Sequence, residues 1–145
     1  MLQDAQGKVL DLLLEFFNTG NTKLADQIFT SHSEVHTPDR VWRGTQEILS
    51  NTSATRAAFP DIHFVDESRF ADGDRVVFQW SVAGTHQGEF MGIPATGQRV
   101  ELRGVSVAQI ENGRIVEEVT YYDRLAVLEQ LGVVARKREV PSAAG

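Results

Sequence analysis

Residues 98–122 read QRVELRGVSVAQIENGRIVEEVTYY, and this stretch decides the fold. Asn112-Gly113 in its middle is the strongest short signal for a β-hairpin with a type I′ turn. Apolar and polar residues alternate on both sides of that turn. The pattern therefore predicts two long antiparallel strands, over residues 98–111 and 114–122.

Two more strands precede this hairpin. Residues 75–86 are rich in Val, Phe and Trp, and residues 62–70 place apolar side chains at period two. The turn Asp72-Gly73-Asp74 separates them. Gly84 and Gly104 lie inside long strands, where glycine allows a bend. We expect a strongly curved antiparallel meander of four strands.

Helical spacing dominates the N-terminal part of the chain. Between residues 9 and 17, apolar residues recur at i, i+3 and i+4, which predicts an amphipathic helix. A short helix is expected over residues 24–29. A third begins near Thr45, a good N-cap residue, and ends before Pro60. Its middle, Ser50-Asn51-Thr52-Ser53, is unusually polar for a packed helix.

The remaining segments complete the predicted architecture. Residues 32–41 are expected to be irregular or short extended chain, because Pro38 blocks a helix. Asp123 is expected to cap a closing helix over residues 124–131, which Gly132 ends. The order predicts an α+β fold, in which three N-terminal helices pack on a curved antiparallel sheet. Such a sheet wraps around the helices and leaves a cone-shaped pocket.

Composition limits what the chain can bind. Its 145 residues suit one domain, expected over residues 1–132, with a flexible tail over 133–145. The chain has no cysteine and a net charge of −6, which argues against disulfides and against nucleic acid as a partner. The basic cluster Arg136-Lys137-Arg138 is interpreted as a solvated end. Without an apolar run long enough for a membrane span, or a signal peptide, the protein is expected in the cytoplasm.

Both faces of the predicted strands are partly apolar. In residues 75–86, one face carries Val76, Phe78, Trp80 and Val82, and the other carries Val77 and Ala83 among polar residues. A sheet in a monomer can leave one face polar and wet. Two partly apolar faces predict a homodimer, in which one face covers the pocket and the other meets a second copy.

A family resemblance appears in the loop before the hairpin. Residues 84–97, GTHQGEFMGIPATG, resemble the signature of SnoaL-like polyketide cyclases, as do Ala58-Phe59-Pro60-Asp61 and residues 110–118, IENGRIVEE. The resemblance implies an NTF2-like cone that is often dimeric. It also implies closure of a ring in a hydrophobic polyketide ester by intramolecular aldol condensation, without a metal or cofactor. In characterised members an Asp on the last strand transfers protons beside a His on the adjoining strand.

The chain departs from that family at the proton-transfer pair. Ungapped alignment back from Gln130-Leu131-Gly132 puts Thr120 at the position of the Asp and Ser106 at that of the His. A threonine hydroxyl is a poor proton shuttle near neutral pH. We therefore look for a replacement acid or base on the same scaffold.

Four titratable residues are the candidates for catalysis: Glu118, His86, Asp123 and His36. Glu118 shares a strand face with Thr120 and would have a raised pKa in an apolar pocket, or it lies at the rim or pairs with Arg103. His86 follows an apolar strand face and suits a general base, or it bonds the loop backbone.

Asp123 and His36 are weaker candidates. Asp123 lies at the pocket end of its strand, where it either caps the last helix or contributes to catalysis. His36 occupies the segment in which related NTF2-like enzymes, such as ketosteroid isomerases, carry a base. Each is expected to line the pocket if it is functional.

The pocket walls are expected to be aromatic and hydroxyl side chains. The predicted substrate-binding residues are Trp42, Trp80, Phe90, Met91, Ser106, Thr120 and Tyr122. No HxH, HxxH or HExxH spacing occurs, so no dedicated metal site is expected. The family resemblance implies that no cofactor is used.

Two functions remain open at this stage. The first is a cofactor-free enzyme that uses acid/base chemistry, of the cyclase, isomerase or hydrolase type, on a hydrophobic, polyketide-like small molecule. The second is a non-catalytic small-molecule-binding or dimerising accessory protein on the same scaffold. A pocket with convergent titratable groups favours the enzyme, and one filled by side chains favours the accessory protein.

Overall fold

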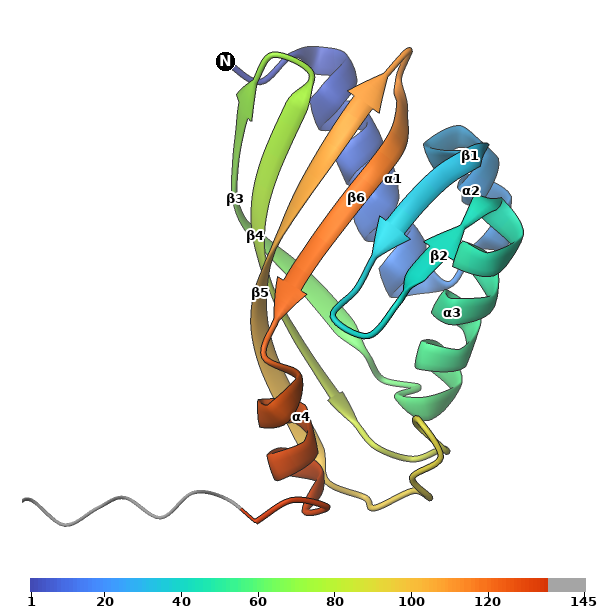
Figure 1. The fold of residues 1–145 in the computed structure, drawn as a ribbon, viewed down its shortest axis with the longest axis vertical. Coiled ribbons are helices and arrows are strands. Elements are labelled where there is room, and N and C mark those ends of the chain that lie inside the picture. The colour runs from blue at the N-terminus through green and yellow to red at the C-terminus, as the bar shows by residue number, and fades with distance from the viewer. Residues whose placement is uncertain (136–145) are drawn as a thin grey trace, which may run out of the picture.

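The computed structural model describes residues 1–135 and contains a mixed six-stranded sheet with helices on one side (Figure 1). Apart from residues 133–135, the predicted tail and its basic cluster lie outside the described residues. The helical elements are α1 (Asp4–Thr19), the 3₁₀ turn η1 (Thr22–Leu24), α2 (Ala25–Ile28), α3 (Gly44–Ala58) and α4 (Arg124–Leu131). The strands are β1 (Phe29–His36), β2 (Val41–Arg43), β3 (His63–Asp72), β4 (Arg75–Thr85), β5 (Arg99–Glu111) and β6 (Arg114–Tyr122).

The predicted meander is confirmed. The sheet order is β2-β1-β6-β5-β4-β3, and β3 to β6 pair antiparallel in chain order. Asn112 and Gly113 both have positive φ, 52° and 73°, as a type I′ turn requires. The hairpin signal in the sequence therefore located the turn between β5 and β6 correctly, and a register shift between Gln109 and Ile110 follows close to it.

Residues 32–41, expected to be irregular or short extended chain, are mostly extended, but their place in the sheet was not predicted, and the sheet is mixed rather than antiparallel. Most of this segment lies in β1 and β2, and β1 runs parallel to β6. Parallel pairing joins segments that are far apart in sequence, so no local turn motif predicts it. Val35 pairs with Glu118 of β6 and Trp42 of β2, which places β1 against the centre of the site.

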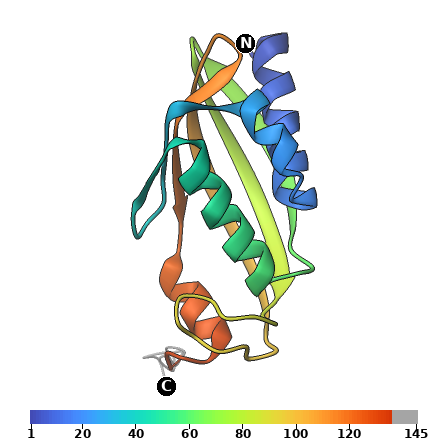
Figure 2. The same ribbon diagram turned by 90° about the vertical axis from the view of Figure 1, so that its right-hand side faces the viewer.

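The helices cover a single face of the sheet. Figure 2 shows α1 and α3 on the same side, with α4 near the loop after β4 at one end. The core forms between these layers, where Val9, Leu13 and Phe16 of α1 are almost fully buried. Among residues 1–135, no helix is long and apolar enough to cross a membrane.

The caps explain how the helices begin. Asp123 caps α4 as expected, because its Oδ1 accepts a hydrogen bond from the Ala126 amide at 3.1 Å. Thr45 is not an N-cap, since α3 begins one residue earlier at Gly44. The Thr45 hydroxyl instead donates to the Thr30 carbonyl at 3.2 Å, and so ties α3 to the start of β1.

Candidate active site

A cavity of about 210 Å³ lies between the sheet and the helices. Its walls are mostly apolar and come from α1, α3 and the inner face of the sheet. Of the predicted wall residues, the cavity is lined by Trp42, Trp80, Phe90, Ser106, Thr120 and Tyr122. The structure therefore has the hollow interior that the sequence predicted. Alternate side chains of β6 face this cavity.

Glu118 is the candidate acid or base that the fold puts in this cavity. Its neighbours across the sheet are Val35 on β1 and Ala108 on β5, and it is only 2% exposed. Burial alone raises its pKa from 4.5 to about 7. The predicted alternative, an ion pair with Arg103, was wrong, because the Arg103 Nη2 lies 2.6 Å from Glu67 Oε2.

Three polar side chains form a chain of hydrogen bonds next to Glu118. The Trp80 indole N–H donates to Ser106 Oγ at 3.0 Å, and Ser106 Oγ lies 3.0 Å from Thr120 Oγ1. The residues come from β4, β5 and β6, respectively. Thr120 and Ser106 are therefore bonded to each other at the cavity wall.

Two further titratable side chains line the cavity. Burial raises the pKa of the Tyr122 phenol, as does the nearby Asp39 carboxylate, while Arg124 opposes them. Asp66 is ion-paired with Arg69, whose Nη2 also lies 2.8 Å from Asp11 Oδ1. The second Asp66 oxygen is buried without a partner among residues 1–135. The cavity thus holds two carboxyl groups and a phenol within mostly apolar walls.

His86 does not line the cavity, contrary to its predicted catalytic role. It is fully buried, and its Nδ1 lies 2.9 Å from the Thr96 hydroxyl and accepts from the Thr96 amide at 3.1 Å. Its ring packs against Phe59, with centroids 5.3 Å apart, and the Phe59 and Phe90 side chains stand at the cavity wall. His86 therefore holds the loop after β4, which is the structural alternative that the sequence left open.

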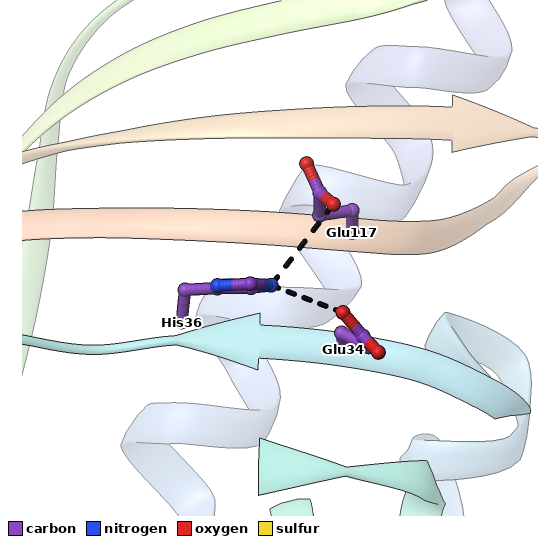
Figure 3. A group of neighbouring side chains, drawn as sticks. All are labelled: Glu34, His36 and Glu117. Carbon is purple, nitrogen blue, oxygen red and sulfur yellow. Dashed lines mark hydrogen bonds and ion pairs between the residues drawn. The ribbon is translucent and has the colours of Figure 1, made fainter. Parts of the chain in front are cut away.

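His36 is also outside the cavity, because the pleat of β1 turns it to the opposite face from Val35. Figure 3 shows it close to Glu34 of its own strand and to Glu117 of the neighbouring β6. Its Nε2 lies 3.1 Å from Glu34 Oε1 and 4.0 Å from Glu117 Oε2. These three residues offer ligand atoms within 4.8 Å of one another, although spacing in the sequence predicts no metal site, and half-exposed acidic groups this close together are common without a bound metal. The ligands come from two strands, which sequence spacing cannot detect.

Asp123 and Met91, which were also predicted site residues, do not line the cavity. Asp123 follows the last inward residue of β6 and turns to the first turn of α4, so it does not line the cavity. Met91 is 45% exposed at a turn with φ of 54°, and the adjacent Phe90 lines the cavity in its place.

Sequence reasoning missed part of the cavity wall. Asp66 interrupts the apolar period of its strand, so the pattern alone does not predict that it lines the cavity. Asn51, Thr52 and Thr55 of α3 also line the cavity. The polar middle of this helix was visible in the sequence, and a polar stretch on a helix that covers a pocket is the signal that could have found them.

The fold and cavity define an NTF2-like α+β protein, a cone of helices and sheet with ionisable groups in an apolar interior. The family model that matches the chain is that of the SnoaL-like polyketide cyclases, over residues 7–131. The protein therefore belongs to the SnoaL-like polyketide cyclase family.

Individual relatives agree with this assignment. The chain is 26% identical over 126 residues to the aklanonic acid methyl ester cyclase DnrD of Streptomyces peucetius, covering 83% of this chain and 86% of DnrD. The crystal structure of IdmH from Streptomyces antibioticus matches with a TM-score of 0.76 and 28% identity over 90% of this chain and 99% of that one. TsrD from Streptomyces laurentii shares the fold, with a TM-score of 0.83 at 21% identity, over 92% of this chain and 99% of that one.

Proposed function

We propose that the protein is a cyclase-type enzyme that needs no cofactor and uses Glu118 as its general acid and base on a polyketide-like substrate. The observation that carries this proposal is the position of Glu118. It is a buried carboxyl at the cavity wall, with a pKa of about 7. A catalytic group with a pKa near the working pH is present in both protonation states and can take a proton and return it.

An intramolecular aldol reaction suits one such group. The Glu118 carboxylate removes a proton from the carbon beside a carbonyl, and the C–H electron pair becomes an enolate. The enolate carbon then attacks a second carbonyl of the same molecule, which forms the C–C bond and leaves an alkoxide. The proton held by Glu118 passes to that alkoxide, so the product is an isomer of the substrate and the enzyme is restored.

The apolar walls contribute by holding the substrate in a folded conformation. Bringing two reacting carbons of one molecule together lowers the entropic part of the barrier. Trp42, Trp80 and Tyr122 offer aromatic surfaces for a planar polyketide.

Turnover of a defined substrate tests the proposal. Because the relative DnrD is an aklanonic acid methyl ester cyclase, this ester is the first compound to test. We expect an isomeric product of equal mass and different elution with the wild-type protein. Glu118→Gln keeps the shape and loses the proton transfer, so we expect turnover to fall by roughly 100-fold or more.

Glu117→Gln is the matched control, since it changes the next residue of β6 on the other face of the sheet. It is expected to leave turnover unchanged. Normal turnover by Glu118→Gln would refute the assignment of Glu118.

The second candidate function is binding without catalysis, which the replacement of the family's Asp and His by Thr120 and Ser106 favours. It predicts that the ester binds to the wild-type protein and to Glu118→Gln and is released unchanged from both. Mass spectrometry of the bound and released ester separates the two functions.

We further propose that the outer face of the sheet pairs with a second copy of the chain. Phe70, Val77, Val107 and Val119 are register partners from β3 to β6 and form an apolar row across that face. Phe70 and Tyr121 are 57% and 58% exposed. Charged residues flank the row, among them Arg75, Arg103 and Glu117, so both signs of charge are present, as a self-complementary twofold interface requires.

A further inference from the structure

The hydrogen-bonded chain of Trp80, Ser106 and Thr120 has a direction. The indole N–H of Trp80 can only donate, so Ser106 Oγ accepts at this contact. Between Ser106 and Thr120, which are 3.0 Å apart, either hydroxyl has the geometry to donate. The direction of this second bond decides which hydroxyl proton is left for a guest in the cavity.

Burial settles the direction. Ser106 is only 2% exposed, and its Oγ has no other hydrogen-bond partner among residues 1–135. If Thr120 donated to Ser106, the Ser106 proton could meet an acceptor only through the small part of that side chain that touches the cavity, whereas Thr120 is the more exposed of the two. Ser106 therefore donates to Thr120, and the Thr120 hydroxyl proton is free at the cavity wall.

The first donor in the chain is held in place by the sheet. Trp80 pairs with Gly104 on the neighbouring strand, and a Cβ at residue 104 would lie 2.2 Å from the indole Cζ2. Only glycine lets the indole lie across β5 so that its N–H reaches Ser106, two residues further along that strand. Hydrogen bonds linked in this way polarise one another and strengthen the last donor.

We infer that Thr120 donates its hydroxyl proton to a carbonyl oxygen of the bound substrate, and that Ser106 and Trp80 are positioning residues that fix its direction. The inference rests on the proposed function, because an enolate or alkoxide oxygen is the charge that such a donor stabilises during an aldol reaction. Thr120 and Glu118 point into the cavity two residues apart on β6, a spacing of ~7 Å in a strand. A substrate that reacts here carries its acidic C–H near Glu118 and a ketone oxygen near Thr120.

Binding of a small aromatic ketone tests the inference without turnover. The probe is 1-tetralone, and its hydrocarbon counterpart tetralin is the matched ligand that lacks the oxygen. Trp42 and Trp80 are the two tryptophans of the chain and both line the cavity, so their fluorescence reports occupancy. The carbonyl stretch of bound ¹³C-labelled 1-tetralone, measured by difference infrared spectroscopy, reports the hydrogen bond itself.

We expect the carbonyl band to shift to lower frequency in the wild-type protein relative to Thr120→Val, which has nearly the same shape. Thr120→Val should bind 1-tetralone about fivefold more weakly, the effect of one neutral hydrogen bond, and tetralin equally well. Thr120→Ser should restore the band. Trp80→Phe and Ser106→Ala should each give a carbonyl band between those of the wild-type protein and Thr120→Val. In these variants the Thr120 hydroxyl remains, but its orientation is no longer fixed.

Ser68→Ala is the control, because it removes an exposed hydroxyl from β3 that bonds Gln79 outside the cavity. An identical carbonyl band in the wild-type protein and Thr120→Val overturns the inference and leaves the role of Glu118 intact. Failure of both ligands to bind overturns the inference and the proposed function together. If Thr120→Val does not fold, equal wild-type affinity for 1-tetralone and tetralin is the result that overturns the inference.

Discussion

Glu117 and Glu118 are adjacent in β6 and have opposite surroundings. The Glu117 side chain is 47% exposed on the outer face, with His36 4.0 Å away. Glu118 is 2% exposed on the inner face, and burial raises its pKa to about 7. The same residue type is thus an ordinary surface carboxylate at one position and a candidate acid at the next. The pleat of the strand, which turns neighbouring side chains to opposite faces, makes this difference.

The sharpest test of this contrast is the dependence of stability on pH. Glu118 has a pKa of about 7 in the folded protein, against 4.5 as its ordinary value. Below about pH 4.5 it is neutral in both states. As the pH rises towards 7, the unfolded chain ionises first, so stability is lost across this window and is constant above it. The loss from this group is about 3 kcal/mol.

Urea unfolding of the wild-type protein and Glu118→Gln at a series of pH values measures this effect. The two free energies of unfolding are expected to diverge between about pH 4.5 and 7, with the variant the more stable at the higher pH. Parallel curves for Glu118→Gln would mean that its carboxyl reaches water in the folded protein.

A second comparison lies at the end of β6, where Tyr122 faces the cavity and Asp123 does not. Asp123→Ala removes the cap of α4 and is expected to cost about 1 kcal/mol of folding free energy. Turnover should be unchanged below the melting transition, and Asp123→Asn should restore most of the stability. A large loss of turnover in the folded Asp123→Ala variant would indicate that Asp123 takes part in catalysis and does not only cap α4.

Local signals in the sequence predicted most of the fold. The Asn112-Gly113 turn and period-two alternation predicted the four-strand meander, and therefore which residues of β6 share a face with Thr120. That alternation alone predicted that Glu118, Thr120 and Tyr122 face one cavity. What failed was the position of β1, whose parallel partner is some 80 residues away in the chain and has no local signal.

The errors in the site follow from side chains whose partners lie elsewhere in the fold. His86 continues the inner face of β4, yet the return of the loop places Thr96 against its ring and takes it out of the cavity. His36 follows Val35, so its face depended on β1, which was not predicted. Asp66 lies beside a register shift in β3, which breaks the alternation that periodicity relies on.

The outer face of the sheet offers the test with the smallest expected effect on the cavity. Phe70→Lys puts a charge into the apolar row that also contains Val119 of β6. Light scattering is expected to give twice the chain mass of 16.1 kDa for the wild-type protein and the single mass for the variant. Folding and 1-tetralone binding should persist, because Phe70 points away from the interior. A monomeric wild-type protein, or a Phe70→Lys variant that is still a dimer, would show that the row from Phe70 to Val119 is not a dimer interface. The outer face of the sheet would then have no role in binding a second copy of the chain.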